Sequence, residues 1–268
     1  LACGANIQES NCIRKRLSLV KGGRFGAACA PAHVLSVILS DVVGDRLDMI
    51  ASGPACVDTS TTAEALDLVE RYHLRLSEQA MALLRQPLPT SLPHVENHMC
   101  GSVSQLCATA AQVCRQLGYR PELVTDRLDC EAKDAGTMLA GLLRQHAGSR
   151  EPLAFIAGGE TVVKLTGHGK GGRNQELALS AAAGISGMEN AAVFSVGSDG
   201  TDGPTDAAGG YVDGGTAARL EALGLSIPAV LAENDAYHAL LAVSGLIITG
   251  PTGTNVNDLS VALLRPAE

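Results

Sequence analysis

Residues 158–176 have the sequence Gly158-Gly-Glu-Thr-Val-Val-Lys-Leu-Thr-Gly-His-Gly-Lys-Gly-Gly-Arg-Asn-Gln-Glu176. This segment follows an apolar run, residues 153–156, and precedes a helix that we expect over residues 174–183. A strand, a glycine-rich loop and a helix in this order are typical of α/β proteins. Glycines let the backbone approach a ligand closely, and Lys170 and Arg173 place positive charge at the start of the helix. The segment therefore predicts a phosphate-binding loop in an α/β fold.

A second glycine-rich loop follows the next predicted strand, and this loop is acidic. Residues 197–210 read Gly-Ser-Asp-Gly-Thr-Asp-Gly-Pro-Thr-Asp-Ala-Ala-Gly-Gly, and no lysine or arginine occurs from residue 174 to residue 218. Magnesium prefers one or two carboxylates together with phosphate oxygens, so Asp199 and Asp202 are candidate metal ligands. The alternative is a solvated turn, because aspartate also hydrogen-bonds its own backbone. Together, a loop that favours anions and one that favours a cation indicate phosphoryl transfer.

The run Gly167-His-Gly-Lys-Gly-Gly172 also matches the Gly-x-Gly-x-x-Gly pattern of dinucleotide-binding loops. The acidic residue that this pattern needs about twenty positions later could only be Asp199, which comes late and lies in its own loop. Lys170 is followed by Gly171, so the segment is no Walker A motif and a P-loop kinase is excluded. Three interpretations stay open for the loop: a phosphate or nucleotide site, a nicotinamide site, and a tight structural turn.

Composition limits the class of protein. The chain has 268 residues, 30 glycines, no tryptophan and a formal charge of −8, with a sequence pI near 5.4. This length fits one large or two modest domains, and the acidic balance argues against nucleic acid or an anionic membrane as a partner. The eight cysteines form no Cys-x-x-Cys pair, and the first residues show no signal-peptide pattern, so we expect a cytoplasmic protein. On a helix, Cys107 and Cys114 would lie near one face, where we expect them to be buried as small hydrophobic residues.

Pro87, Pro89 and Pro93 mark the clearest break in the chain, because prolines interrupt helices and inner strands. We place a domain boundary there, with residues 1–92 in a first α/β domain and 93–268 in a second. Beyond the break, predicted strands and helices alternate, which favours a parallel sheet. We predict strands near 97–102, 120–124, 153–156, 161–166, 191–196 and 246–249, and helices near 104–117, 131–146, 174–183, 216–223 and 235–243.

Further polar loops follow other predicted strands. Residues 250–258, Gly-Pro-Thr-Gly-Thr-Asn-Val-Asn-Asp, carry hydroxyls and amides that can close over a ligand or only turn the chain. In the first part of the chain, Ser40-Asp41 and Ser52-Gly-Pro54 form similar elements. His94, His98 and Cys100 lack a fourth partner, so zinc is rejected.

Taken together, the loops 39–45, 50–54, 158–161, 169–176, 197–206 and 250–255 resemble those of the bacterial glycerate 2-kinases that carry a carboxy-terminal MOFRL domain. The resemblance covers essentially the whole chain and places the MOFRL-like region at about 150–264. It implies an α/β fold of two domains, with parallel or mixed sheets flanked by helices and a cleft between the domains. It also implies phosphorylation of D-glycerate to 2-phosphoglycerate with ATP and Mg²⁺. The family includes proteins named hydroxypyruvate reductases of tartrate degradation, so an NAD(P)H-dependent reductase is the alternative enzyme.

The resemblance implies roles for individual residues. Arg173 would stabilise the transferring phosphoryl group, and Asp199 would take the proton of the substrate hydroxyl. The residues expected to bind the nucleotide are Ser40, Asp41, Ser52, Gly53, Glu160, Gly169, Lys170, Gly171, Gly172, Asn174, Thr252, Gly253, Thr254 and Asn255.

One departure from the family pattern concerns the amino terminus. Family members begin with a further segment that carries a Ser-Gly-Gly-Gly-Ser-type loop and an active-site lysine, and this sequence contains neither. We therefore expect a fragment or a remnant, for which a non-catalytic nucleotide-binding role is a third hypothesis. We expect glycerate as the small-molecule partner, no nucleic acid or membrane partner, and a possible homodimer.

Overall fold

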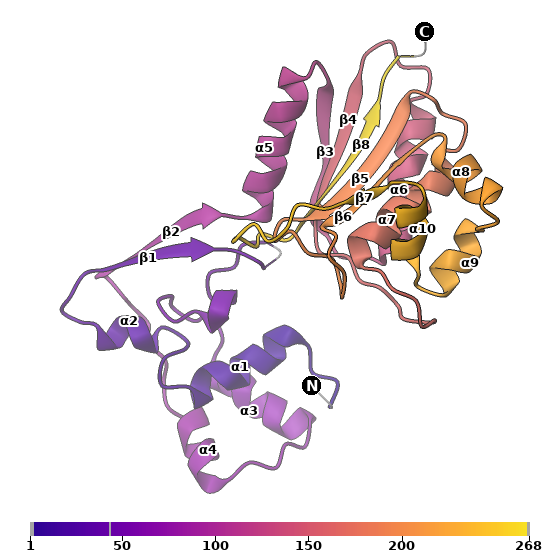
Figure 1. The fold of residues 1–268 in the computed structure, drawn as a ribbon. Helices are drawn as coiled ribbons and strands as arrows, with labels where there is room; N and C mark the ends of the chain where they lie inside the picture. The colour runs from indigo at the N-terminus through magenta and orange to yellow at the C-terminus, as the bar shows by residue number, and fades with distance from the viewer. Residues whose placement is uncertain (1–2, 43, 267–268) are drawn as a thin grey trace. The chain divides into compact units, whose positions relative to one another are not determined.

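A computed structural model describes residues 3–42 and 44–266, and the chain divides into two units between Cys100 and Gly101 (Figure 1). The division falls after Cys100 because β2 (Val95–Gly101) pairs with β1 (Val34–Leu39) in a two-stranded sheet. The proline-rich residues 87–93 therefore connect elements of the first unit. The assignment of residues 1–92 to a remnant of an amino-terminal domain stays a prediction.

The first unit contains mainly short helices. Besides its two strands it has α1 (Ile7–Leu17), α2 (Arg24–Ala28), α3 (Thr62–Arg71), α4 (Glu78–Leu84) and a 3₁₀ turn at Ile50–Ser52. The helix α3 begins after Thr61 because Thr61 and Glu64 form a capping box, in which each side chain accepts a hydrogen bond from the other residue's backbone N–H.

The second unit is a six-stranded mixed sheet with helices on both faces. Its elements are α5 (Val103–Gln116), β3 (Arg120–Leu128), α6 (Ala132–Gln145), β4 (Leu153–Gly159), α7 (Arg173–Gly184), β5 (Ala191–Gly197), β6 (Gly209–Asp213), α8 (Thr216–Ala222), α9 (Ile227–Ala232), α10 (Ala236–Ala242), β7 (Leu246–Ile247) and β8 (Asp258–Leu264). The strand order is β3-β4-β8-β5-β6-β7, and the prediction of an α/β fold is confirmed.

The pairing in this sheet corrects the expectation of a parallel sheet. β3 and β4 run parallel, but β8 is inserted between β4 and β5 and is antiparallel to both. β6 is antiparallel to β5 and to β7. The last strand of the chain thus lies at the centre of the sheet, where an apolar run such as residues 259–264 is buried on both faces.

Two layers of side chains bury the sheet, and β4 contributes to both because its side chains alternate between faces. Ala154 and Ile156 pack with Cys107 and Cys114 of α5 on one face. Figure 1 shows α6 and α7 on the other face of the sheet. Phe155 packs with these two helices there, and Leu139, Leu143, Leu177 and Leu179 are fully buried. The predicted burial of both cysteines is confirmed, and burial raises the pKa of the Cys107 thiol to about 11.

One predicted strand, residues 161–166, is absent. β4 ends at Gly159, and the chain then continues beside the start of α6, where Val162 forms a single parallel bridge with Glu131 and hydrogen-bonds with Cys130 and Ala132. Its apolar residues at 162, 163 and 165 led to the strand prediction, but Leu165 is 80% exposed. Among residues 3–42 and 44–266, no helix combines the length and the hydrophobicity that a bilayer crossing needs.

Candidate functional site

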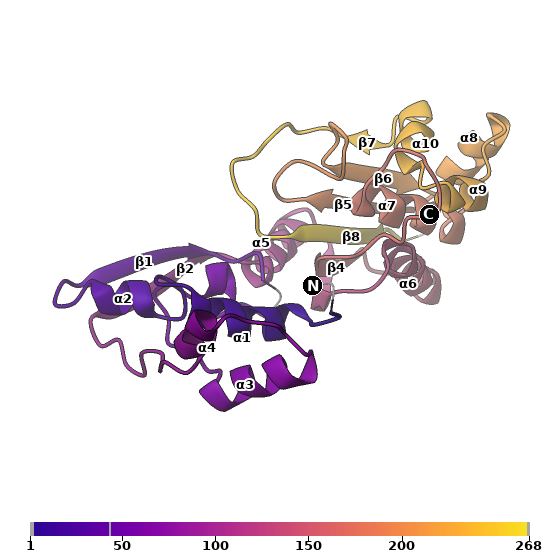
Figure 2. The ribbon, with the colours of Figure 1, turned by 90° about the horizontal axis from the view of Figure 1, so that it is seen from below.

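The two glycine-rich loops meet at one edge of the large sheet because β8 lies between β4 and β5. Its first residue, Asp258, is opposite Gly159 at the end of β4 and opposite Gly197 at the end of β5. The loop that contains Glu160 and the loop that contains Asp199 therefore leave the sheet on either side of Asp258. Figure 2 shows the loops that follow β5 and precede β8 emerging at the same end of the sheet.

Arg173 joins these elements through its side chain. Its Nε donates to Asp258 Oδ2 at 2.6 Å, its Nη2 donates to Asp258 Oδ1 at 3.1 Å, and its Nη1 donates to Glu160 Oε1 at 2.7 Å. We call these three residues the Arg173 cluster. The side chain of Asp258 is 7% exposed, whereas those of Arg173 and Glu160 are 34% and 48% exposed. The cluster thus has a buried end at Asp258 and an open end at Arg173 and Glu160.

The electrostatics of the cluster follow from this difference in burial. Burial raises the pKa of the Asp258 carboxyl, and the hydrogen bonds from Arg173 offset part of that rise. For Arg173, burial lowers the pKa, but the hydrogen bond to Asp258 and the two nearby carboxylates raise it by more. Arg173 is therefore a permanent cation at this edge.

The loop of residues 250–257 folds onto the loop after β5. The N–H of Thr252 donates to the carbonyl oxygen of Asp199 at 3.0 Å, and its hydroxyl donates to the carbonyl oxygen of Ser198 at 2.5 Å. Asp199 Oδ1 accepts from the N–H of Thr201 at 2.9 Å. The exposed residues Thr252, Gly253, Thr254 and Asn255 thus lie beside Asp199.

Asp202 faces inward and caps α7. Its carboxylate accepts from the backbone N–H of Asn174 at 3.1 Å and of Gln175 at 2.9 Å, and also from both side-chain amides. Asn174 Oδ1 in turn accepts from the Ser195 hydroxyl at 2.6 Å. A buried carboxylate therefore occupies the anion position at this helix N-terminus. The predicted metal role of Asp202 and nucleotide role of Asn174 stay predictions, and these contacts support a structural role instead.

The glycines of residues 167–172 fit against neighbouring loops. A Cβ on Gly167 would overlap the backbone of Glu233, and one on Gly169 would overlap Asp235, while one on Gly172 would overlap the Asp202 carboxylate. Close packing within the protein thus accounts for these three glycines. Lys170 lies over the ring of Tyr237, with Nζ 4.1 Å from the ring centroid, which is a cation–π contact. Gly171 packs beside Asn234 and Ala236.

The other candidate residues belong to the first unit. The Ser40 hydroxyl donates to the carbonyl oxygen of Val42, and Asp41 is exposed. Ser52 and Gly53 follow Ala51 in a turn where all three have positive φ, at 61°, 62° and 50° respectively. Ser52 Oγ accepts from Lys21 Nζ at 3.2 Å. A left-handed backbone at two residues that carry a Cβ is costly, which makes this turn a candidate for function.

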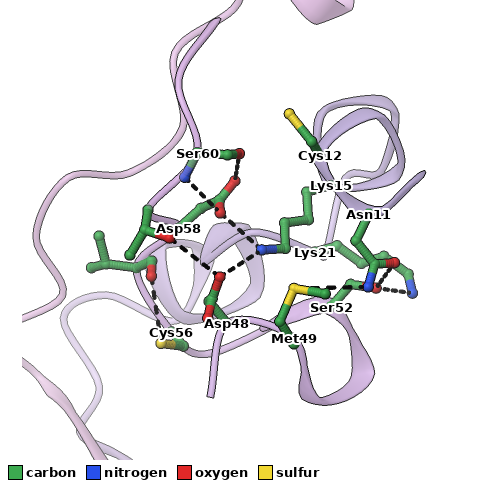
Figure 3. A network of polar contacts seen from close by, with 12 residues as sticks. Asn11, Cys12, Lys15, Lys21, Asp48, Met49, Ser52, Cys56, Asp58 and Ser60 are labelled. Atoms are coloured by element: carbon green, nitrogen blue, oxygen red, sulfur yellow. Dashed lines mark hydrogen bonds and ion pairs between the residues drawn. The ribbon is translucent and has the colours of Figure 1, made fainter. Parts of the chain in front are cut away.

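Sequence reasoning missed two groups of residues. In the sequence, Asp258 ends a polar loop, and only the apolar run after it indicates that a strand begins there. The second group lies in the first unit, where Lys15 Nζ contacts Asp48 Oδ2 at 3.1 Å and Asp58 Oδ1 at 2.8 Å (Figure 3). Lys15 is 2% exposed, and Arg16 beside it is 1% exposed and contacts Asp58. The basic run 14–16 was visible in the sequence, but its burial was not.

A magnesium ion would fit this site only together with a substrate. Within the described ranges, no three or more His, Cys, Asp or Glu side chains gather as a metal-binding group. Magnesium at phosphoryl-transfer sites takes one or two carboxylates and completes its shell with phosphate and water. Asp199, which is partly exposed and has one carboxylate oxygen held by Thr201, is chemically suited to such a role.

The fold and these contacts define an α/β protein that presents an anchored arginine and an aspartate loop at one sheet edge. Comparison with protein-family models matches residues 153–258 to the MOFRL family and residues 1–85 to a domain of unknown function, DUF4147. The crystal structure of glycerate kinase from Thermotoga maritima superposes with a TM-score of 0.94 at 49% identity, over 98% of this chain and 64% of that chain. A Pyrococcus horikoshii protein of known structure matches with a TM-score of 0.88 at 40% identity, over 99% and 64% of the two chains.

Named relatives agree with these matches. A glycerate kinase from Macaca fascicularis is 35% identical over 99% of this chain and 81% of its own length. A protein from Agrobacterium vitis, named provisionally as a hydroxypyruvate reductase, is 38% identical over 98% of this chain and 71% of its own length. The chain belongs to the glycerate kinase family whose members carry the MOFRL domain. It spans 64% of the length of the Thermotoga D-glycerate 2-kinase that it matches.

Proposed function

We propose that this protein phosphorylates D-glycerate to 2-phosphoglycerate with ATP. The observation that carries the proposal is the anchored Arg173 at the same sheet edge as the Asp199 loop. Phosphoryl transfer depends mainly on positioning and on neutralisation of the charge that spreads over the transferred group. Arg173, which two carboxylates hold in place, can neutralise the charge of the transferred group, and the neighbouring Asp199 can position the substrate hydroxyl. The relatives named glycerate 2-kinase support the choice of substrate.

In the proposed reaction, the 2-hydroxyl oxygen of D-glycerate attacks the γ-phosphorus of ATP. A new P–O bond forms, the bond between the γ-phosphorus and the β–γ bridging oxygen breaks, and its electron pair leaves with ADP. The hydroxyl proton passes to the Asp199 carboxylate and then to solvent. The free N–H groups of Arg173 donate to oxygens of the transferring phosphoryl group, and bound magnesium would neutralise part of its charge, with Asp199 as the candidate ligand.

The remaining candidate residues have supporting roles in this proposal. Lys170 and the exposed loop Thr252–Asn255 would contact the nucleotide, because they supply an ammonium group, hydroxyls and backbone N–H groups. The predicted binding roles of Ser40, Asp41, Ser52 and Gly53, which belong to the first unit, stay predictions. The phosphate would meet the side chain of Arg173 and not the N-terminus of α7, because Asp202 already occupies the amides there.

A coupled assay of ADP release by the full-length protein, with D-glycerate as the acceptor, tests the proposal. Arg173→Ala should lower kcat by about 100- to 1,000-fold, the range for loss of one preorganised transition-state donor. Arg219→Ala is the matched control, since Arg219 pairs with Asp213 in the same unit at 3.0 Å. No turnover by the wild-type protein would contradict the proposal, and nucleotide binding without turnover in calorimetry would favour a non-catalytic binding role.

The second candidate is an NAD(P)H-dependent hydroxypyruvate reductase, which the name of the Agrobacterium relative favours. A dinucleotide site of the Gly-x-Gly-x-x-Gly type seats the pyrophosphate on the helix N-terminus. In this structure, the Asp202 carboxylate accepts the N–H groups of Asn174 and Gln175 at that position. The negative charge of Asp202 would therefore repel the pyrophosphate of a dinucleotide bound at this helix N-terminus. NADH absorbance measured with hydroxypyruvate separates the two activities: oxidation of NADH would support the reductase.

A further inference from the structure

We propose that Asp258 is a positioning residue of the phosphoryl-transfer site, because it fixes the guanidinium plane of Arg173 so that one N–H on each terminal nitrogen stays available to the substrate. This inference rests on the proposed function. Asp258 itself contacts no substrate in the proposal and acts through Arg173.

The hydrogen bonds of Arg173 show which groups remain available. A guanidinium has five N–H groups, one on Nε and two on each terminal nitrogen. Asp258 takes the N–H of Nε and one N–H of Nη2, and Glu160 takes one N–H of Nη1. Among the contacts of residues 3–42 and 44–266, one N–H remains on Nη1 and one on Nη2. Each of these donors can bind an oxygen of a phosphoryl group, and a hydrogen bond between a guanidinium and a charged phosphoryl oxygen is among the strong ones.

Both partners are attached to rigid elements. The backbone of Asp258 is held by pairing of β8 with β4 and with β5, and the residue is 5% exposed. Arg173 is the first residue of α7, where the caps from Asp202 fix the following two residues. A two-point contact between a fixed strand and a fixed helix start leaves the guanidinium little freedom to rotate. Preorganised donors of this kind are the ones that lower a reaction barrier.

Glu160, the second carboxylate of the Arg173 cluster, holds Arg173 less tightly than Asp258 does. Its contact with Arg173 is a single hydrogen bond, and its side chain is 48% exposed. An exposed ion pair contributes little because water screens it. Glu160→Gln should therefore lower kcat less than Asp258→Asn does, although both substitutions remove one negative charge from the cluster.

The test is a double-mutant cycle in the full-length protein with Asp258→Asn, Arg173→Lys and the combination. Asp258→Asn should lower kcat by about 10- to 100-fold, which is the loss in activity found when a residue that orients a metal-binding side chain is replaced. The KM values for ATP and D-glycerate should change by less than about threefold. Because Asp258 acts through Arg173, the combined variant should be no slower than Arg173→Lys alone. Asp213→Asn, which breaks an arginine pair elsewhere in the unit, is the matched control.

Two outcomes of the cycle would overturn the proposal: a kcat for Asp258→Asn within twofold of wild type, or effects that multiply in the combined variant. If the Asp258→Asn protein does not fold, the alternative test measures turnover by the Arg173→Ala protein with and without added guanidinium ion. Partial recovery of turnover by millimolar guanidinium would show that the carboxylate pair still seats the cation, and no recovery would contradict the positioning role.

A nuclear magnetic resonance experiment on ¹⁵N-arginine protein separates this inference from the proposed function. The Nε–H of Arg173 should give a shifted, slowly exchanging signal that Asp258→Asn abolishes, whether or not the protein phosphorylates D-glycerate. Wild-type protein without kinase activity would refute the function alone. A rapidly exchanging Arg173 Nε–H in the wild-type protein would refute the positioning role alone.

Discussion

The backbone of Gly136 on α6 packs directly against the carbonyl oxygen of Leu177 on α7. A Cβ on Gly136 would overlap that oxygen and would lie 3.0 Å from both Ala181 N and Ser180 Cβ. The two helices thus approach each other at a point where only a hydrogen atom fits. This approach positions α7, whose first residue is Arg173.

We expect Gly136→Ala to destabilise the protein by about 2 kcal/mol, because overpacking in a core forces backbone shifts of that cost. Gly141 on the same helix is the matched control, since a Cβ there meets nothing within 4 Å. Gly141→Ala should stabilise by up to about 1 kcal/mol, because alanine loses less backbone entropy in a helix. Thermal unfolding followed by circular dichroism measures both changes. Equal effects of the two substitutions would contradict the close helix contact.

The second prediction concerns the proton acceptor. Asp199→Asn should lower kcat by about 100- to 10,000-fold, the usual contribution of general base catalysis, while the KM for ATP changes little. Steady-state kinetics at saturating magnesium provide the measurement. If the substitution weakened nucleotide binding and left kcat unchanged, the role of Asp199 as base would be contradicted and only its role as metal ligand would remain.

The third prediction separates the two roles considered for Asp202. Asp202→Ala leaves the buried N–H groups of Asn174 and Gln175 without their acceptor, so we expect a loss of roughly 3 kcal/mol in the free energy of unfolding. Asp206→Ala in the same loop should shift the melting temperature little, since Asp206 is exposed. If Asp202 were a metal ligand, folded Asp202→Asn protein would instead need much more magnesium for half-maximal activity at unchanged stability.

The fourth prediction concerns the buried lysine of the first unit. Lys15→Met leaves Asp48 and Asp58 without the ammonium group between them, and removal of one partner of a buried ion pair costs about 3–5 kcal/mol. Hydrogen exchange of the α1 amides, measured by mass spectrometry on the full-length protein, should therefore accelerate strongly. Glu96→Gln, which removes an exposed pair with His98 on β2 of the same unit, should leave exchange in α1 almost unchanged.

The same network determines how stability depends on pH. Burial raises the pKa values of Asp48 and Asp58, but hydrogen bonds lower both below the ordinary value of 3.8. The donors to Asp48 are Arg46 and Lys15, and the donors to Asp58 are Lys15 and Ser60. Their charges therefore stabilise the fold above about pH 4, and this contribution is lost as the pH falls through the lowered pKa values. Calorimetric melting temperatures between pH 5 and about pH 2 should fall less steeply in Lys15→Met than in the wild type. Parallel slopes would contradict this assignment.

Several elements could be predicted from local sequence because local physics forms them. The helix at Thr61 follows from a capping box, and the strand at residues 153–156 follows from an apolar run bounded by proline and glycine. β6 and β8 were missed for a different reason. β6 begins with Gly209 and Gly210, which carry no side chain to signal a strand, and β8 follows a polar loop and pairs with strands far away in the sequence.

The sequence by itself determined the α/β class, the family resemblance and the residue types of the candidate site, because glycine-rich loops after apolar runs leave a local record in the chain. Only the tertiary structure decided which of those residues act together. Inserting β8 between β4 and β5 brings Asp258 to Arg173, across 85 positions of sequence, and the folding of the loop after β5 turns Asp202 inward onto α7. Long-range pairing and burial are properties of the packed chain, and no short segment encodes them.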